Sequence, residues 1–210
     1  MAQREKQHTR SRYDLIAPLY NFMEWPIEEF VFKQWRKELW DQIKGPQVLE
    51  IGVGTGKNIP YYPENIELTA MDLSPGMLKR AEQQLAEKQK PRVTLKEMDA
   101  ENMDFPDDHF DEAVATFVFC SVPDAILGLK EALRVTKPGG KLHLLEHMRA
   151  DQPALATAMD KLDRPIHYLI GVHIARRTVS NVKKAGWKIE SVRDLTFGGI
   201  VKKIEARKPH

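Results

Sequence analysis

The sequence has a single cysteine, Cys120, so an internal disulfide framework is excluded. A chain of this length without disulfides is typical of proteins that fold in a reducing compartment. No apolar run approaches the roughly 20 residues that a membrane-spanning helix needs, and the first residues show no apolar signal-peptide core. We therefore expect a cytoplasmic protein, and its 210 residues predict one domain.

An excess of one charge is also missing, since 32 Lys and Arg residues nearly balance 30 Asp and Glu residues. A nucleic-acid partner is not expected, because the sequence has no basic patch with interleaved aromatic residues. His, Cys and carboxylate residues form no cluster with the ligand spacing of zinc, so we predict no metal site. Cys120 follows an apolar run and is expected to pack as a small buried side chain.

The most informative stretch is residues 48–58, V-L-E-I-G-V-G-T-G-K-N. Its first four residues are a short apolar run with one acid, Glu50, which is typical of a buried parallel strand. Three glycines follow at once and allow the backbone to turn sharply and to approach a ligand. In open α/β sheets, such a junction of strand and glycine loop binds nucleotide-like cofactors. A dinucleotide fingerprint would need its third glycine at the position of Lys57, and the phosphate-binding loop pattern is also absent.

Strand-like and helix-like segments alternate along the chain, which predicts a doubly wound parallel sheet. The expected strands are residues 48–51, 66–71, 93–98, 110–119, 141–146, 187–195 and 199–206. The expected helices are residues 27–43, 74–89, 124–135 and one or two within 153–185, which Gly186 ends. A turn is expected at 137–140. Only a short turn separates the last two strands, so they form a hairpin and one of them must run antiparallel.

Acidic residues stand where the second and third strands end. Asp72 ends the second strand, and a carboxylate in that position hydrogen-bonds a ribose diol in dinucleotide folds. Asp99 and Ala100 follow the third strand, where we expect them to meet an adenine edge. Because no pyrophosphate cradle accompanies these residues, the pattern predicts an adenosine that lacks phosphates.

The order and spacing of these segments resemble the class I S-adenosylmethionine-dependent methyltransferases over residues 13–206. The strings with this similarity are V-L-E-I-G-V-G-T-G, M-D-A-E-N-M-D-F-P-D-D-H-F-D and L-R-V-T-K-P-G-G-K-L. The resemblance implies an α/β, Rossmann-like three-layer sandwich with a seven-stranded, mostly parallel sheet of order 3-2-1-4-5-7-6 and an antiparallel last strand. It also implies S-adenosyl-L-methionine as the cofactor and S-adenosyl-L-homocysteine as its product. The residues assigned to the cofactor are Tyr13, Tyr20, Glu50, Gly52, Gly54, Gly56, Asn58, Asp72, Leu73, Ser74, Asp99, Ala100 and Thr116.

Further strings are similar to the small-molecule and lipid branch of this class. Y-D-L-I-A-P-L-Y-N, residues 13–21, resembles the N-terminal lid of ubiquinone- and menaquinone-type methyltransferases, in which a tyrosine closes over the cofactor. Phospholipid N-methyltransferases resemble the chain at F-C-S-V-P-D (119–124), E-H-M (146–148) and A-R-R-T-V-S-N-V-K-K-A-G-W (175–187). Related thiol methyltransferases share much of the same pattern.

Methyl transfer from a sulfonium is an in-line displacement, for which proximity and orientation supply a large share of the acceleration. A general base is needed only where the acceptor must lose a proton. We name two candidates for catalysis, Tyr20 in the lid and His147 after the fifth strand. His147 either positions or deprotonates the acceptor, or it caps the edge of the sheet. His167, Tyr168 and His173 lie in the tail helices and are expected to be structural.

The N-terminal region has features of a membrane contact. Residues 1–12 are rich in Arg and Lys, which predicts either a solvated end or a basic arm at an anionic membrane surface. The apolar face of the expected helix 27–43 comprises Val31, Phe32, Trp35, Leu39 and Ile43. Phe30 and Trp40 fall outside that face, and such additional aromatic residues suit a lid over a lipophilic substrate or a membrane interface.

Together these features predict an enzyme that methylates a lipid head-group amine, of the phosphatidylethanolamine type, at a membrane surface. Alternative acceptors are soluble or amphiphilic small molecules, such as a quinone precursor or a thiol. A non-catalytic cofactor-binding module is the alternative from another class, and Lys57 disfavours a nicotinamide oxidoreductase. Within one domain, residues 1–45 are expected to form a helical lid segment and 46–150 the cofactor-binding core. Residues 151–210 are expected to supply the substrate-side helices and the terminal hairpin.

Overall fold

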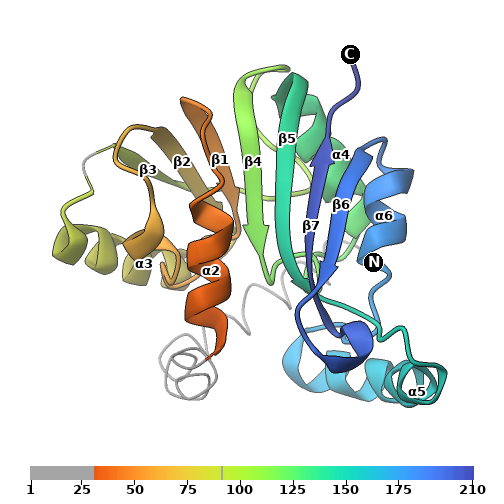
Figure 1. The fold of residues 1–210 in the computed structure, drawn as a ribbon. Helices are drawn as coiled ribbons and strands as arrows, with labels where there is room; N and C mark the ends of the chain where they lie inside the picture. The colour runs from red at the N-terminus through yellow and green to blue at the C-terminus, as the bar shows by residue number, and fades with distance from the viewer. Residues whose placement is uncertain (1–30, 91) are drawn as a thin grey trace.

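The computed structural model describes residues 31–90 and 92–210, so the predicted site residues Tyr13 and Tyr20 lie outside the described part of the chain. Seven strands form one sheet in the order β3-β2-β1-β4-β5-β7-β6 (Figure 1). They are β1 Gln47–Ile51, β2 Glu67–Asp72, β3 Val93–Glu97, β4 Phe110–Thr116, β5 Thr136–His147, β6 Lys188–Asp194 and β7 Val201–Arg207. Pairs from β3 to β5 are parallel, and β7 is antiparallel to both its neighbours. The predicted fold class and strand order are confirmed.

Helices cover both faces of this sheet. They are α2 Lys33–Trp40, α3 Pro75–Lys88, α4 Ala125–Val135, α5 Pro153–Ile170 and α6 Thr178–Lys184, with short 3₁₀ segments η2 Ile59–Tyr61 and η3 Phe197–Gly199. One core cluster includes Leu129 of α4 and Val182 of α6, and the other includes Leu39 of α2 and Ala81 of α3. Because side chains alternate along a strand, β1, β2, β4, β5 and β7 contribute to both clusters. The result is the expected three-layer sandwich.

The described part of the predicted helix 27–43 corrects one expectation. Trp40 was expected outside the buried face, but its side chain is fully buried and its ring lies 4.6 Å from that of Tyr62. Val31, expected to be buried, is 38% exposed. Residues 31–32 form a wider π-type turn, so the uniform 100° spacing used for the prediction does not hold across the start of α2.

Two strand boundaries also differ from the prediction. The fourth strand is predicted to reach residue 119 but ends at Thr116. Phe117 has a left-handed φ of 58°, and this backbone conformation is incompatible with an extended strand. The expected turn at 137–140 lies inside β5. There Phe110 pairs with Thr136 and Glu112 with Lys141, so the intervening residues bulge from the ladder.

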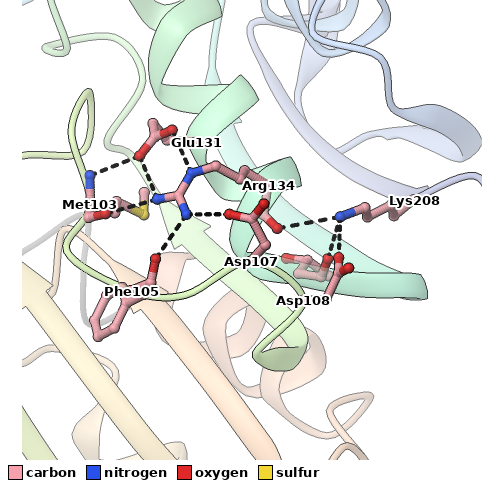
Figure 2. A network of polar contacts seen from close by, with 8 residues as sticks. Met103, Phe105, Asp107, Asp108, Glu131, Arg134 and Lys208 are labelled. Carbon is pink, nitrogen blue, oxygen red and sulfur yellow. Dashed lines mark hydrogen bonds and ion pairs between the residues drawn. The ribbon is translucent and has the colours of Figure 1, made fainter.

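Arg134 on α4 fastens the connection between β3 and β4 (Figure 2). Its guanidinium donates hydrogen bonds to the backbone oxygens of Met103 and Phe105, both at 2.8 Å, and to the Asp107 carboxylate at 2.7 Å. Glu131 accepts from Arg134 and from the Met103 N–H. The Asp108 and His109 N–H groups also bond the backbone oxygens of Arg134 and Val135, at 3.0 and 2.8 Å, so these contacts fix the connection where it leads into β4.

Candidate active site

A pocket opens where β1, β2 and β4 end. Its walls come from the glycine loop after β1, the ends of β2 and β4, and the segments 98–100 and 121–123. Arg36 of α2 adds a charged wall. This is the edge at which open α/β sheets bind ligands, because several loops converge there.

The three glycines of the loop differ in what a side chain at each position would contact. All have positive φ: 71° at Gly52, 55° at Gly54 and 86° at Gly56. A Cβ on Gly52 would lie 2.4 Å from Val118 Cγ2, and one on Gly56 would lie 2.5 Å from Ile59 Cδ1. A Cβ on Gly54 would meet no atom within 4 Å. Gly54 lines the pocket, so its backbone borders open space that a side chain would fill.

Asp72 joins the glycine loop to the end of β2. Its carboxylate accepts the N–H of Gly54 at 2.9 Å through one oxygen and the N–H of Ser74 at 2.9 Å through the other. Ser74 in turn accepts the Met77 N–H through its hydroxyl and caps α3. Asp72 therefore shapes two walls of the pocket while its carboxylate lines the cavity.

The wall beyond β3 is apolar with one acid. Met71, Met98 and Ala100 line it together with Asp99. Asp99 is held in a tight turn, because its carboxylate accepts the Glu101 N–H at 2.9 Å. An apolar wall that includes one carboxylate suits an aromatic heterocycle that has polar groups on its rim.

A buried polar network forms the opposite wall. The Arg36 guanidinium, only 5% exposed, donates to Thr116 Oγ1 and to Asn58 Oδ1, both at 2.9 Å. The Asn58 amide donates to Thr116 Oγ1 at 2.9 Å and to Glu50 Oε1 at 2.5 Å. Arg36 also lies over the Phe117 ring, 5.4 Å from its centroid. A guanidinium in this position makes this end of the pocket suited to an anionic group.

Glu50 anchors the network from beneath the glycine loop. Its side chain is fully buried and accepts from Asn58 and from the Tyr62 hydroxyl. Burial raises the pKa of Glu50 to about 7, although the two hydrogen bonds and the Arg36 guanidinium act to lower it.

Glu146, at the end of β5, holds the loop that follows β4. Its carboxylate is fully buried, and Oε1 accepts the N–H groups of Val118 at 2.9 Å and Phe119 at 3.0 Å. Burial raises the pKa of Glu146 to about 8, against the lowering effect of the two donors. Val118 lies where a Cβ of Gly52 would be, so Glu146 supports the glycine loop through Val118.

The predicted cofactor residues fall into two groups. Those that line the pocket are Gly52, Gly54, Asp72, Leu73, Ser74, Asp99, Ala100 and Thr116. Those that lie behind its wall are Glu50, Gly56 and Asn58. The second group supports the first, and the assignment of each residue to the cofactor stays a prediction.

The candidate base His147 is half-buried at the end of β5, opposite Val201 of β7, and is not part of the described pocket wall. Burial lowers its pKa, so the imidazole is neutral at neutral pH. His173 bonds Asp163 of α5 at 2.7 Å, and its ring stacks on His167 at 3.8 Å. Cys120 is buried. Among the described residues, no His, Cys, Asp and Glu side chains group as metal ligands.

Sequence reasoning missed Arg36 and did not foresee what Glu146 does. For Arg36 a signal was present, since it is spaced at helical intervals from Leu39 and Ile43 and so lies on the buried face. Glu146, like Glu50, is an acid at the end of an apolar strand. A buried acid of this kind needs partners, but the sequence does not reveal that they are backbone groups of a distant loop.

Comparison with known proteins gives the class. Residues 49–144 match a family described as a methyltransferase domain. The chain is 34% identical over 158 residues to a phosphatidylethanolamine N-methyltransferase of Cereibacter sphaeroides, covering 72% of this chain and 78% of the relative. It is 30% identical over 225 residues to a demethylmenaquinone methyltransferase of Paenarthrobacter aurescens, covering 94% and 85%. The chain therefore belongs to the S-adenosylmethionine-dependent methyltransferases.

The fold is shared more widely than the sequence. The solved structure of the [4+2]-cyclase SpnF superposes with a TM-score of 0.79 over 97% of this chain and 96% of that chain, at 19% identity. The protein is accordingly a class I S-adenosylmethionine-dependent methyltransferase by family and by strand order. Its cofactor is S-adenosyl-L-methionine.

Proposed function

We propose that this methyltransferase transfers methyl groups to a lipid head-group amine of the phosphatidylethanolamine type at a membrane surface. The observation that carries the proposal is the 34% identity to a phosphatidylethanolamine N-methyltransferase over 78% of that relative. The pocket supports it, because Val118 and Val122 are among its lining residues and provide apolar surface that suits an amphiphilic acceptor. No helix in the described ranges is long and apolar enough to cross a bilayer.

We assign the ends of the pocket to the parts of the cofactor. The open space against Gly54, which a Cβ would fill, suits close approach of a ligand to the backbone. Asp72 would accept from the ribose hydroxyls, and the wall at Asp99 and Ala100 would hold the adenine. Arg36 would bind the carboxylate of the methionine moiety, because a guanidinium suits a carboxylate better than any other side chain.

The bound cofactor supplies an electrophilic methyl group on a sulfonium. The protein would contribute by orienting the reactants. Asp72 holds the glycine loop and Glu146 holds the loop after β4, so the walls of the pocket are fixed in place. Orientation of this kind supplies of order 7–11 kcal/mol at best. A head-group ammonium must lose a proton before its nitrogen can attack. We assign the removal of that proton to His147, the last residue of β5, whose imidazole is neutral, and we keep Tyr20 as the candidate lid residue from the sequence.

A quinone precursor is the second candidate acceptor. The observation that favours it is the 30% identity to a demethylmenaquinone methyltransferase over 94% of this chain. A small thiol, which the sequence resemblance also allows, is the third. Neither of these acceptors requires the protein to meet a bilayer.

The test is to incubate the protein and labelled S-adenosylmethionine with liposomes that contain phosphatidylethanolamine, at several contents of anionic lipid. Parallel reactions contain a demethylated quinone or a small thiol. We expect label in the phospholipid fraction, and loss of that label in the His147→Ala variant with cofactor binding unchanged. Absence of methylated lipid at every charge composition would overturn the lipid proposal, and label in the quinone or thiol would replace it.

A further inference from the structure

The outward face of α5, formed by Ala158, Lys161, Leu162, Arg164, Pro165 and Tyr168, is unusual for a surface helix. Leu162 is 52% exposed and Tyr168 is 74% exposed. The other members are exposed too, and none is acidic. A solvated helix face normally mixes charges of both signs, whereas this face combines apolar side chains with cations only.

The acids of α5 are occupied elsewhere. Asp160 accepts two hydrogen bonds from Arg149, at 2.8 and 2.7 Å. Asp163 accepts from the Ala175 N–H at 2.9 Å and pairs with His173 at 2.7 Å. Lys161 and Arg164 have no partner within residues 31–90 and 92–210. Within the described part of the chain, this face therefore combines apolar side chains with two cations that no carboxylate bonds.

A second apolar side chain extends this face. Phe197 of η3 is 89% exposed. The N–H of Asp151, which lies just before α5, donates to the backbone oxygen of Gly198, the neighbour of Phe197, at 2.9 Å. A Cβ on Gly198 would lie 3.3 Å from Leu155 of α5. Leu155 and Leu162 are seven residues apart and so share one side of the helix. Gly198, the neighbour of Phe197, therefore lies against the side of α5 that carries Leu155 and Leu162.

This surface lies next to the pocket mouth. In Figure 1, α5 sits beyond the carboxyl ends of β4 and β5, the edge at which the pocket opens. His173, which bonds α5 through Asp163, donates its backbone N–H to Cys120 O at 2.9 Å. Arg176 donates to the carbonyl of Val122, a residue of the pocket wall, at 2.7 Å. The segment that follows α5 is thus bonded to the loop that forms part of the pocket wall.

We propose that the outward face of α5, together with Phe197, docks on an anionic lipid bilayer and presents the pocket mouth to the head groups. This inference rests on the proposed function, because an enzyme that methylates a lipid must reach its acceptor at a bilayer. Charge complementarity identifies the occupant: apolar side chains enter the interface while Lys161 and Arg164 meet anionic lipids. A second copy of the chain is a poorer occupant, because a two-fold contact would oppose these cations to their own copies.

The test is flotation of the full chain with vesicles of phosphatidylcholine alone or mixed equally with phosphatidylglycerol. One variant, K161E/R164E, reverses the charges, and a second, L162S/F197S, removes the apolar side chains. The matched control, K183E/K184E, makes the same charge change on exposed residues of α6. Calorimetric titration with S-adenosylmethionine shows that each variant keeps its fold and pocket.

We expect the wild-type protein to float with anionic vesicles only and to be released by salt. K161E/R164E should bind about thirtyfold more weakly or worse, since each cation near such a surface contributes about one factor of five. L162S/F197S should also lose binding, while the control binds as wild type does. Equal losses of vesicle binding in the control and in K161E/R164E would overturn the proposal. A wild-type protein that is a dimer in solution, with L162S/F197S a monomer, would also overturn it.

The proposal of a docking surface and the proposal of a lipid acceptor can be tested separately. If the protein floats as expected but transfers no methyl group to phosphatidylethanolamine, the surface stands and the acceptor is wrong. If the variants methylate phosphatidylethanolamine in mixed micelles as fast as wild type and lose activity on vesicles, the surface is supported. If they keep full activity on vesicles, the surface is wrong and the acceptor stands.

Discussion

The Arg36 guanidinium and the Thr116 hydroxyl lie 2.9 Å apart although 80 residues separate them in the chain. This contact joins α2 to the carboxyl end of β4 in one wall of the pocket. It also brings a buried cation to the end of the pocket that we assign to the cofactor's methionine moiety. The helix that leads from the N-terminal segment is thereby tied to the cofactor site.

Arg36→Met should weaken the binding of S-adenosylmethionine by about 1.5–3 kcal/mol, the usual value for a hydrogen bond to a charged group. Calorimetry with S-adenosylmethionine and with its decarboxylated form measures this. The wild-type protein should prefer the carboxylated ligand, and the variant should lose that preference. Arg92→Met, at an exposed ion pair with Glu67, is the control. A variant that still discriminates between the two ligands would contradict the assignment.

Gly54→Ala should abolish cofactor binding while the fold persists. The new Cβ would meet no protein atom within 4 Å, so the variant suffers only the strain of its positive φ, about 1–2 kcal/mol. Gly52→Ala should instead destabilise the fold, because its Cβ would lie 2.4 Å from Val118. Thermal unfolding and ligand titration separate the two cases. Equal losses of stability would show that Gly54 is not at the ligand surface.

Asp72→Ala should weaken cofactor binding by about 1–3 kcal/mol, because it removes the ribose acceptor and frees the Gly54 and Ser74 N–H groups. Asp72→Asn keeps one acceptor oxygen and should have a smaller effect. Asp41→Ala, at an exposed pair with Lys37, serves as the control in the same titration. Unchanged affinity in Asp72→Ala would overturn the ribose assignment.

Stability should fall as pH rises from about 5 to about 8. The pKa of Glu146 is raised to about 8 by burial, so the folded state binds a proton in this window that the unfolded state has released. The slope of the unfolding free energy against pH is then negative, and Glu50, with its pKa raised to about 7, adds to it.

Glu146→Gln tests this cause. Glutamine keeps the oxygen that accepts the Val118 and Phe119 N–H groups but does not titrate. Urea unfolding at pH 5.5, 6.5, 7.5 and 8.5 should therefore give a flatter profile than wild type. Glu205→Gln, on β7 and partly exposed, should leave the profile unchanged. A profile as steep in Glu146→Gln as in wild type would refute the role of this carboxyl.

Most of the sheet follows from local patterns. Strand-like runs bounded by turn residues predicted all seven strands. The signal is clearest for the central strands β1 and β4, because a parallel strand buried on both faces needs apolar side chains throughout. The hairpin that makes β7 antiparallel follows from the length of one turn. The exceptions lie where the backbone leaves regular geometry, at Phe117 and within β5, because a left-handed φ at a phenylalanine and a bulge depend on what packs around them.

The sequence by itself determined the strand order, because its motifs resemble those of a family. It also determined the residues of the glycine loop and Asp72. These depend on neighbours in the chain, since a loop can bend sharply only where glycines allow a positive φ. The tertiary structure alone decided that Arg36, Asn58 and Thr116 share one network and that Glu146 holds Val118. Such contacts join residues far apart in the chain, and their geometry exists only once the helices have packed on the sheet.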